Sequence, residues 1–331
     1  AAGLSVSGVP ANPNPARVIN LSLAGSGSCS AAYADAIAEI RAAGVLIVAA
    51  AGNETGAVEE PANCAGVLGV AGIRHVGTKV GYSSFGPEVG ISAPAGNCVN
   101  VGTGQPCLYP FITPINFGLN GPLGNGYTGV YDVTIGTSFA VPLVSGTAAL
   151  MLAANPALSE PELTARLKRG ATAFPVDPSL PICPSVTSDG QCNCTTTTCG
   201  AGMLNAAAAV SLALGPLVDI GVSGSTVSGS TITLTADSST TLVSWQWAQI
   251  SGPASGSFGS ANSATTTFTP PVAGSYQIRL TVTDSNGRSI STDTSLSVTA
   301  PPSSGGGATD PISLAALLAL ALLAACRRLR H

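Results

Sequence analysis

One serine of this chain occupies a position where a hydroxyl could act as a nucleophile. Ser138 belongs to the block Gly136-Thr-Ser-Phe-Ala-Val-Pro-Leu-Val-Ser-Gly, which opens a long apolar run. We expect a helix from Thr137 to Ala154, apolar nearly all round and therefore buried, with Pro142 in its first turns, where a missing N–H costs little. A helix N-terminus presents unpaired N–H groups that stabilise the oxyanion formed when a hydroxyl attacks a carbonyl. Ser138 is therefore our candidate nucleophile, with simple helix capping as the alternative.

A second polar side chain follows a predicted strand. The unbroken apolar run Val45-Leu-Ile-Val-Ala-Ala-Ala is typical of a parallel strand covered on both faces, and Asn53 comes directly after it in Ala50-Ala-Gly-Asn-Glu. Open α/β sheets place their sites beyond the carboxyl ends of such strands. An amide there can donate to an oxyanion, whereas a bare Ala-Gly-Asn more often forms a turn. The order of the two blocks favours a functional role for Asn53.

Both blocks resemble motifs of the subtilisin family of serine peptidases, one the nucleophile motif and the other the oxyanion-asparagine motif. Further stretches that fit the same family are Asn20-Leu-Ser-Leu-Ala-Gly, Tyr82-Ser-Ser-Phe-Gly with Ala93-Pro-Ala-Gly, and Gly200-Ala-Gly-Met-Leu-Asn-Ala. The resemblance covers about Val18 to Val210. It implies hydrolysis of peptide bonds in polypeptide substrates, through an acyl-enzyme on Ser138 with an oxyanion hole from Asn53.

The resemblance also implies where the substrate lies. An extended peptide would pair with the backbone of the edge segment, which consists of Ser22, Leu23, Ala24 and Gly25, and would pass beside Ala51 and Gly52. Backbone pairing implies broad endopeptidase action on unfolded or extended chains. Glu59 falls where the family builds the floor of its primary specificity pocket, and a carboxylate there would pair with Arg or Lys. The alternative is that Glu59 and Glu60 are both solvated.

The chain departs from the family pattern in its acid and base. The family's aspartate and histidine precede the asparagine in chain order, but no residue before Val18 is Asp or His. We therefore expect both groups upstream of Ala1, which leaves the triad incomplete in these 331 residues. His75 follows Asn53 in a Gly-flanked loop and is not expected to be the base. Leu143 replaces a histidine that usually follows the motif's proline and that is not the general base.

Two other functions are alternatives to an endopeptidase. A degenerate peptidase domain could serve adhesion in a cell-surface binding protein, and an upstream His and Asp in family context would favour the enzyme instead. An esterase or lipase is disfavoured because the sequence contains no Gly-x-Ser-x-Gly elbow.

The elements that position these residues belong to an α/β domain. Residues 31–43 show apolar positions at helical spacing and end before Gly44, between the apolar runs that begin at Val18 and Val45, which together predict a βαβ unit. A further helix opens with a capping box of Ser159 and Glu162 and ends at Gly170. We expect a subtilisin-like parallel sheet over residues 1–215, with its N-terminal part missing.

The pattern of residue types changes from Pro216 onwards. Period-two alternation in the runs beginning at Ser230, Val243, Thr265 and Tyr276 predicts an immunoglobulin-like β-sandwich over residues 216–300, which resembles domains of the PKD type. Residues 301–331 combine Gly305-Gly-Gly, a short apolar run and a basic end, and they resemble the GlyGly-CTERM class of bacterial sorting tails. A marginal membrane anchor is the alternative, because about 15 residues of helix span only about 22 Å.

Composition and cysteines indicate the compartment. Only 8% of residues are charged and the net charge is −4, so nucleic acid is not an expected partner. No signal peptide opens the chain at Ala1. The first eight of nine cysteines occur in local groups, and we expect disulfides rather than zinc at Cys192, Cys194 and Cys199. We thus predict a secreted or cell-surface protein of a Gram-negative-type bacterium, attached through its tail, without a cofactor and with structural calcium left open.

Overall fold

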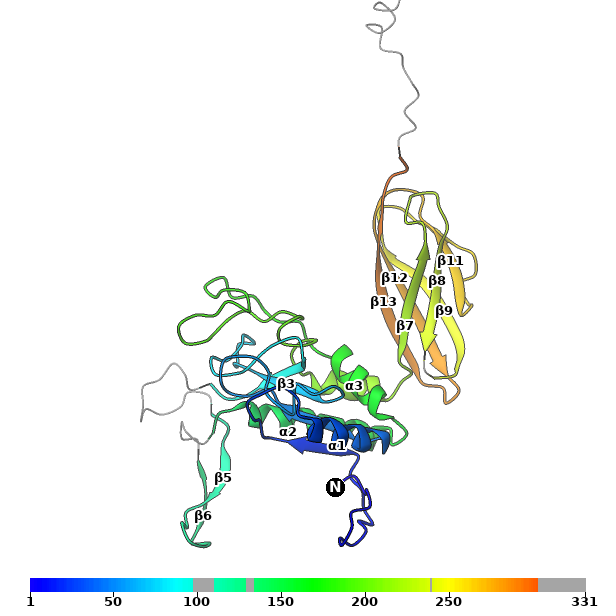
Figure 1. The fold of residues 1–331 in the computed structure, drawn as a ribbon. Coiled ribbons are helices and arrows are strands. Elements are labelled where there is room, and N and C mark those ends of the chain that lie inside the picture. The colour runs from blue at the N-terminus through cyan, green and yellow to red at the C-terminus, as the bar shows by residue number, and fades with distance from the viewer. Residues whose placement is uncertain (98–109, 129–133, 239, 303–331) are drawn as a thin grey trace, which may run out of the picture. The chain divides into compact units, whose positions relative to one another are not determined.

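The computed structural model describes residues 1–97, 110–128, 134–238 and 240–302, which form two compact units described separately below (Figure 1). Of the linker and sorting tail predicted over residues 301–331, residues 303–331 lie outside these residues, as do Cys98, Cys107 and Cys326. The domain boundary expected between residues 215 and 216 stays a prediction.

A four-stranded parallel sheet forms the centre of the first unit, in the order β1-β2-β3-β4. Its strands are β1 (Val18–Leu21), β2 (Leu46–Ala50), β3 (Leu68–Ile73) and β4 (Val89–Pro94). Every residue of β2 is buried, as an unbroken apolar run in a doubly covered parallel strand requires. Thus the predicted βαβ unit is confirmed. Strand β1 ends at Leu21, two residues before the end of the run Val18-Ile-Asn-Leu-Ser-Leu.

Helices cover both faces of this sheet, and β2 shows how its side chains divide between them. Leu46, Val48 and Ala50 pack into a core with α2 (Thr137–Ala154), α3 (Glu160–Arg169) and α4 (Ala206–Ala213). Ile47 points to the other face, where it packs with Ile37 of α1 (Ala31–Ala42). The capping box of Ser159 and Glu162 is present at the start of α3.

Helix α2 begins and ends as predicted but buries only one face. Ala140, Val144 and Met151 are fully enclosed against the sheet, whereas Leu143 and Leu150 are 37% and 58% exposed. The expectation that α2 is buried all round was therefore wrong. Of the described helices, α2 alone is long and apolar enough to cross a membrane, yet its buried face makes it a core helix here.

The second unit is an antiparallel β-sandwich, as the alternating sequence predicted. One sheet has the order β10-β11-β8-β7 and the other the order β13-β12-β9. The strands are β7 (Val218–Gly224), β8 (Ile232–Ser238), β9 (Leu242–Ser251), β10 (Ser257–Phe258), β11 (Thr265–Thr269), β12 (Gly274–Asp284) and β13 (Ser289–Val298). Alternate residues of β12 are buried, beginning with Tyr276 and Ile278, so that strand supplies a continuous core face. A separate hairpin of β5 (Thr113–Asn116) and β6 (Asn125–Thr128) belongs to the first unit and was not predicted.

Six of the cysteines form three disulfides, which confirms the disulfide interpretation. The bridges are Cys29–Cys64, Cys183–Cys192 and Cys194–Cys199. The sulfur atoms of Cys183, Cys194 and Cys199 lie within 4.8 Å of one another, which is close enough to suggest a metal cluster. Each is already bonded to a second sulfur, so none offers the thiolate that zinc requires.

Candidate active site

Ser138 occupies the first turn of α2, directly after a glycine that turns the chain. Gly136 has φ of 141°, a conformation that side chains disfavour, and the helix begins at Thr137. The Ser138 hydroxyl donates to the Ser22 carbonyl oxygen at 3.2 Å. The turn of residues 136–138, which carries the candidate nucleophile and which we call the nucleophile turn, therefore lies against the start of the predicted substrate-pairing segment.

Pro142 explains a second contact between these two serines. In a regular helix the N–H of residue 142 would donate to the carbonyl of Ser138, but proline has no N–H. The Ser22 hydroxyl donates to that carbonyl instead, at 2.8 Å. Pro142 thus leaves the Ser138 carbonyl free to accept the hydrogen bond from Ser22 that joins α2 to the end of β1.

Asn53 lies beside the same turn with a defined amide orientation. Its Oδ1 accepts hydrogen bonds from the Thr137 N–H at 2.9 Å and from the Thr137 hydroxyl at 3.0 Å. The amide nitrogen Nδ2 is thereby turned away from Thr137, and Asn53 is exposed. Within the described residues neither Asn53 Nδ2 nor the Ser138 N–H has a protein acceptor, so both donors are available to an oxyanion.

Tyr82 contacts the nucleophile turn through its hydroxyl group. Its hydroxyl accepts a hydrogen bond from the Gly136 N–H at 3.0 Å and lies 2.5 Å and 2.8 Å from the carbonyl oxygens of Ala95 and Gly96. Burial raises the pKa of the Tyr82 hydroxyl, so the group stays a neutral donor and acceptor. The sequence indicated Tyr82 only as the start of a family-like block, because its partners are distant in the chain.

A chain of side-chain hydrogen bonds joins α2 to the end of β1. The Ser145 hydroxyl donates to Asn20 Oδ1 at 3.1 Å, and Asn20 Nδ2 donates to the Ser22 hydroxyl at 2.8 Å. Ser22 then donates to the Ser138 carbonyl. These contacts fix the position of Ser22 relative to Ser138. The sequence placed Asn20 and Ser145 in family-like blocks but did not indicate that the two side chains meet.

The segments expected to bind substrate are joined to one another. Ser22, Leu23, Ala24 and Gly25 are all exposed, and Gly25 exchanges two backbone hydrogen bonds with Glu60, at 2.8 Å and 3.0 Å. The Glu59 N–H donates to the Ala51 carbonyl at 2.9 Å. The edge segment, the strand end at Ala51 and Gly52, and Glu59 therefore surround one region of the surface.

Glu59 lies across Gly52, where a side chain would not fit. A Cβ on Gly52 would come within 2.5 Å of the Glu59 carboxyl carbon, and Gly52 has φ of 111°. Desolvation and, secondly, the negative charge of Glu54 raise the pKa of Glu59. A cationic side chain beside this carboxylate would lower its pKa.

His75 lies in the loop after β3, at a separate cavity of about 410 Å³ that it lines with Arg74, Pro94, Thr172 and Asn205. Desolvation and the neighbouring Arg74 lower its pKa. The described contacts of Ser138 do not include His75. The expectation that His75 is not the base stays a prediction.

A parallel sheet covered by helices on both faces, followed by an immunoglobulin-like sandwich, defines a subtilisin-like α/β protein with an appended module. The chain belongs to the subtilase family, also called Peptidase S8, which it matches over residues 4–215. Residues 223–298 match a family of PKD domains, so a PKD-like domain is present.

Named relatives are similar to the first of these domains. The extracellular protease of Xanthomonas campestris pv. campestris is 37% identical over 217 residues, which are 65% of this chain and 32% of that protein. The extracellular basic protease of Dichelobacter nodosus is 35% identical over 179 residues, 52% of this chain and 27% of that protein. This chain therefore spans a third or less of either relative's length.

A solved structure of a protease from Pseudoalteromonas arctica PAMC 21717 is similar in fold. It has a TM-score of 0.52 and 35% identity, over 64% of this chain and 56% of that one.

Proposed function

We propose that this chain is part of a secreted serine endopeptidase in which Ser138 attacks the carbonyl carbon of a peptide bond. The observation that carries the proposal is the arrangement at the start of α2. The Ser138 hydroxyl, the Ser138 N–H and the Asn53 amide nitrogen meet at one turn, and hydrogen bonds to Thr137 fix the orientation of Asn53. Relatives named extracellular proteases support it.

In the proposed reaction, the Ser138 oxygen forms a bond to the substrate carbonyl carbon while its proton passes to a base. The carbonyl oxygen becomes an oxyanion that accepts from the Ser138 N–H and Asn53 Nδ2. Collapse of this intermediate breaks the C–N bond, the base returns the proton to the leaving amine, and an acyl-enzyme remains on Ser138. Water then releases the acyl group by the same steps.

We propose that the base and its acid partner lie in a segment upstream of Ala1. The family order supports this, because no His or Asp occurs before Val18. The first unit also supports it, since β1 is an edge strand and Leu143 and Leu150 of α2 are exposed. Further strands beside β1 would pair its free edge and cover apolar surface.

The proposed site of action is outside the cell or at its surface. Three disulfides are consistent with an oxidising compartment. The Gly305-Gly-Gly segment and the apolar run after it support a sorting tail, and we propose that the mature extracellular form ends near Gly307. Intact-mass measurement of secreted protein that still carries His331 would count against this.

The proposed role of Asn53 is tested by kinetics in a form of the protein that cleaves peptides. Asn53→Ala removes one oxyanion donor, so we expect kcat to fall about 100- to 1,000-fold with KM little changed, the loss known for the corresponding asparagine of subtilisin. Asn262→Ala changes an exposed asparagine of the sandwich and serves as the control. An unchanged kcat in Asn53→Ala would show that the oxyanion is held elsewhere.

A further inference from the structure

A second cavity opens beside Tyr82, the residue whose hydroxyl bonds the nucleophile turn at Gly136. Its volume is about 460 Å³. One wall is formed by Thr55, Gly81 and Tyr82, and the other by the loop of residues 186–190, which we call the disulfide loop because the Cys183–Cys192 bridge closes it. No motif in the sequence pointed to this loop.

The disulfide loop has a tight and well-bonded tip. The Gly190 N–H donates to the Thr187 carbonyl, and the Gln191 N–H donates to the Thr187 hydroxyl, both at 2.9 Å. Gly190 has φ of 78°, and a Cβ there would lie 2.8 Å from the Thr55 side chain and overlap the Gly81 backbone. The disulfide loop therefore packs directly against Thr55 and Gly81, which form the other wall of the cavity.

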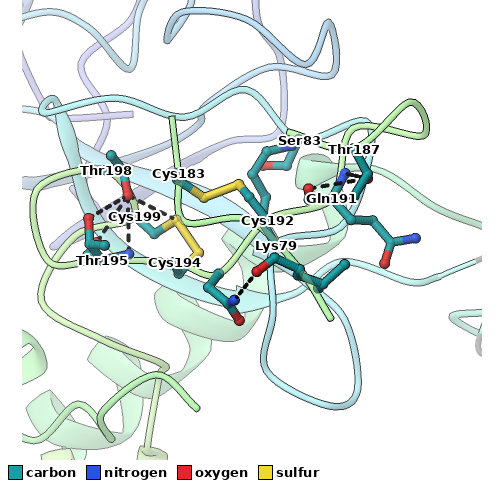
Figure 2. The surroundings of a disulfide bond; sticks show 12 residues. Lys79, Ser83, Cys183, Thr187, Gln191, Cys192, Cys194, Thr195, Thr198 and Cys199 are labelled. Atoms are coloured by element: carbon teal, nitrogen blue, oxygen red, sulfur yellow. Dashed lines mark hydrogen bonds between the residues drawn. A yellow bond between two sulfur atoms is a disulfide. The ribbon is translucent and has the colours of Figure 1, made fainter. Parts of the chain in front are cut away.

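The base of the disulfide loop is fixed by a buried lysine. The Lys79 N–H donates to the Cys192 carbonyl at 3.1 Å, and Figure 2 shows Lys79 next to Cys192, with Thr187 and Gln191 on the same loop. The Lys79 ammonium donates to the carbonyls of Val80 and Gly81, and the Asp189 carboxylate is near enough to raise the pKa of Lys79. The cavity thus has a covalently closed and internally bonded wall.

Tyr82 and Thr55 connect the cavity to the turn that carries Ser138. Ser22 contacts Ser138, whereas Tyr82 contacts Gly136, two residues earlier in the same turn. Thr55 is two residues beyond Asn53, and its N–H donates to the Tyr82 carbonyl at 2.9 Å. If the acyl half of a peptide follows Ser22 to Gly25, its leaving half is directed past Gly136 toward Tyr82.

The lining suits a long basic side chain. The 40% exposed Val186 offers apolar surface to a methylene stem, and Asp189 is the charged residue of the lining. The Asp189 carboxylate accepts from the Thr187 hydroxyl and, at 2.6 Å, from Gln191 Nε2. These neutral donors orient the carboxylate, and among the described residues no cation lies within ion-pair distance of Asp189, although Lys79 interacts with it at longer range.

We propose that this cavity binds an arginine or lysine side chain from the leaving half of the substrate, through Asp189. The proposal rests on the proposed endopeptidase function, because it names the substrate class that the same site selects. It assigns the disulfide loop a role in specificity rather than in stability alone.

The test measures binding without catalysis. The 331-residue chain is titrated with the peptides Ala-Arg-Ala-amide and Ala-Gln-Ala-amide, and amide chemical shifts are followed by NMR. We expect the arginine peptide to shift residues 55, 81–82 and 186–190 and to bind about two- to fivefold more tightly, the range of one exposed ion pair. Asp189→Asn keeps the size and an acceptor oxygen, and should abolish this difference.

The matched control is Asp177→Asn, on the same segment of the chain. The Asp177 carboxylate accepts from the Ser179 N–H at 2.9 Å, and Asp177 does not line the cavity, so the difference between peptides should persist. Equal binding of both peptides to the unaltered chain, or a preference that survives Asp189→Asn, would overturn the proposal.

Cleavage profiling separates this inference from the proposed function. In a peptide-cleaving form of the protein, Asp189→Asn should lower the preference for Arg and Lys after the scissile bond and leave the rate on neutral substrates unchanged. Normal cleavage with an unaltered preference would overturn the specificity role alone. Failure to cleave any peptide once an upstream segment with the His and Asp is added would contradict the proposed function, and the binding test would still decide the cavity's role.

Discussion

A single buried lysine should make the stability of the first unit depend on pH in a predictable direction. Lys79 is fully buried, its ammonium donates to the Val80 and Gly81 carbonyls at 3.1 Å and 2.9 Å, and it lies 5.0 Å from the Phe85 ring centre. Burial lowers its pKa from 10.5 to about 8, against the opposing effect of Asp189.

The sign follows from the protons bound in each state. Between pH 8 and pH 10.5 the unfolded chain holds a proton on Lys79 that the folded chain has released, so the free energy of unfolding rises with pH there. Below pH 8 both states are protonated, and the charged lysine costs the fold roughly 3 kcal/mol, from a pKa lower by about 2.5. Between about pH 7 and pH 9.5 we expect a gain of roughly 2 kcal/mol.

Urea unfolding of the oxidised chain across this pH range measures the effect. Lys79→Met should remove the rise, whereas Lys168→Met, which changes an exposed lysine of α3, should preserve it. Measurements stop at about pH 9.5 so that ionisation of tyrosines in the unfolded state does not intervene. A rise of equal size in Lys79→Met would refute the assignment of this dependence to Lys79.

Three further predictions concern the parts that support the site. Tyr82→Phe removes the hydroxyl that bonds Gly136, Ala95 and Gly96, so we expect the free energy of unfolding, measured with denaturant, to fall by about 1–3 kcal/mol. The control is Tyr33→Phe, because the Tyr33 hydroxyl has no described hydrogen bond, and it should leave the free energy of unfolding nearly unchanged. Replacing Cys29 and Cys64 by serine opens a loop of 35 residues and should lower the free energy of unfolding by about 4 kcal/mol. Replacing Cys194 and Cys199, which are separated by 5 residues, should lower it by about 2 kcal/mol. Equal losses of stability in the two variants would argue against a loop-entropy origin. Glu59→Gln should weaken cleavage after Arg and Lys in a peptide-cleaving form of the protein. With Glu59 in place, the preference for Arg and Lys should fade as the pH falls through the raised pKa of Glu59. A cleavage profile showing only aromatic or aliphatic preference before the scissile bond would contradict this role.

Local signals in the sequence account for much of the fold. The capping box at Ser159, the unbroken apolar run of β2 and the alternation along β12 each specify their element through neighbours within a few residues. The start of α2 at Thr137 was likewise predictable from its motif. The bounds of α2 agree with the prediction, whereas β12 begins at Gly274, two residues before the predicted alternating run.

Contacts between distant segments were not predictable from the same signals. Tyr82 meets Gly136 across 54 residues, and Asn20 meets Ser145 across 125 residues, so neither pairing leaves a local pattern. Exposure along α2 depends on which segments cover it, and its composition alone suggested burial on every side. The Asp189 cavity depends on a loop tip against Gly81, which only the folded chain brings together.

Fluorophosphonate labelling, with the modified peptide identified by mass spectrometry, tests the central claim most directly. Ser138 needs a positioned base to take its proton, and loss of the histidine of subtilisin lowers kcat by about 10⁶-fold. We predict no adduct on Ser138 in the 331-residue chain and a stable adduct on Ser138 once an upstream segment with the His and Asp is added. Robust labelling of Ser138 in the 331-residue chain would show that a base lies within it and would contradict the proposed triad.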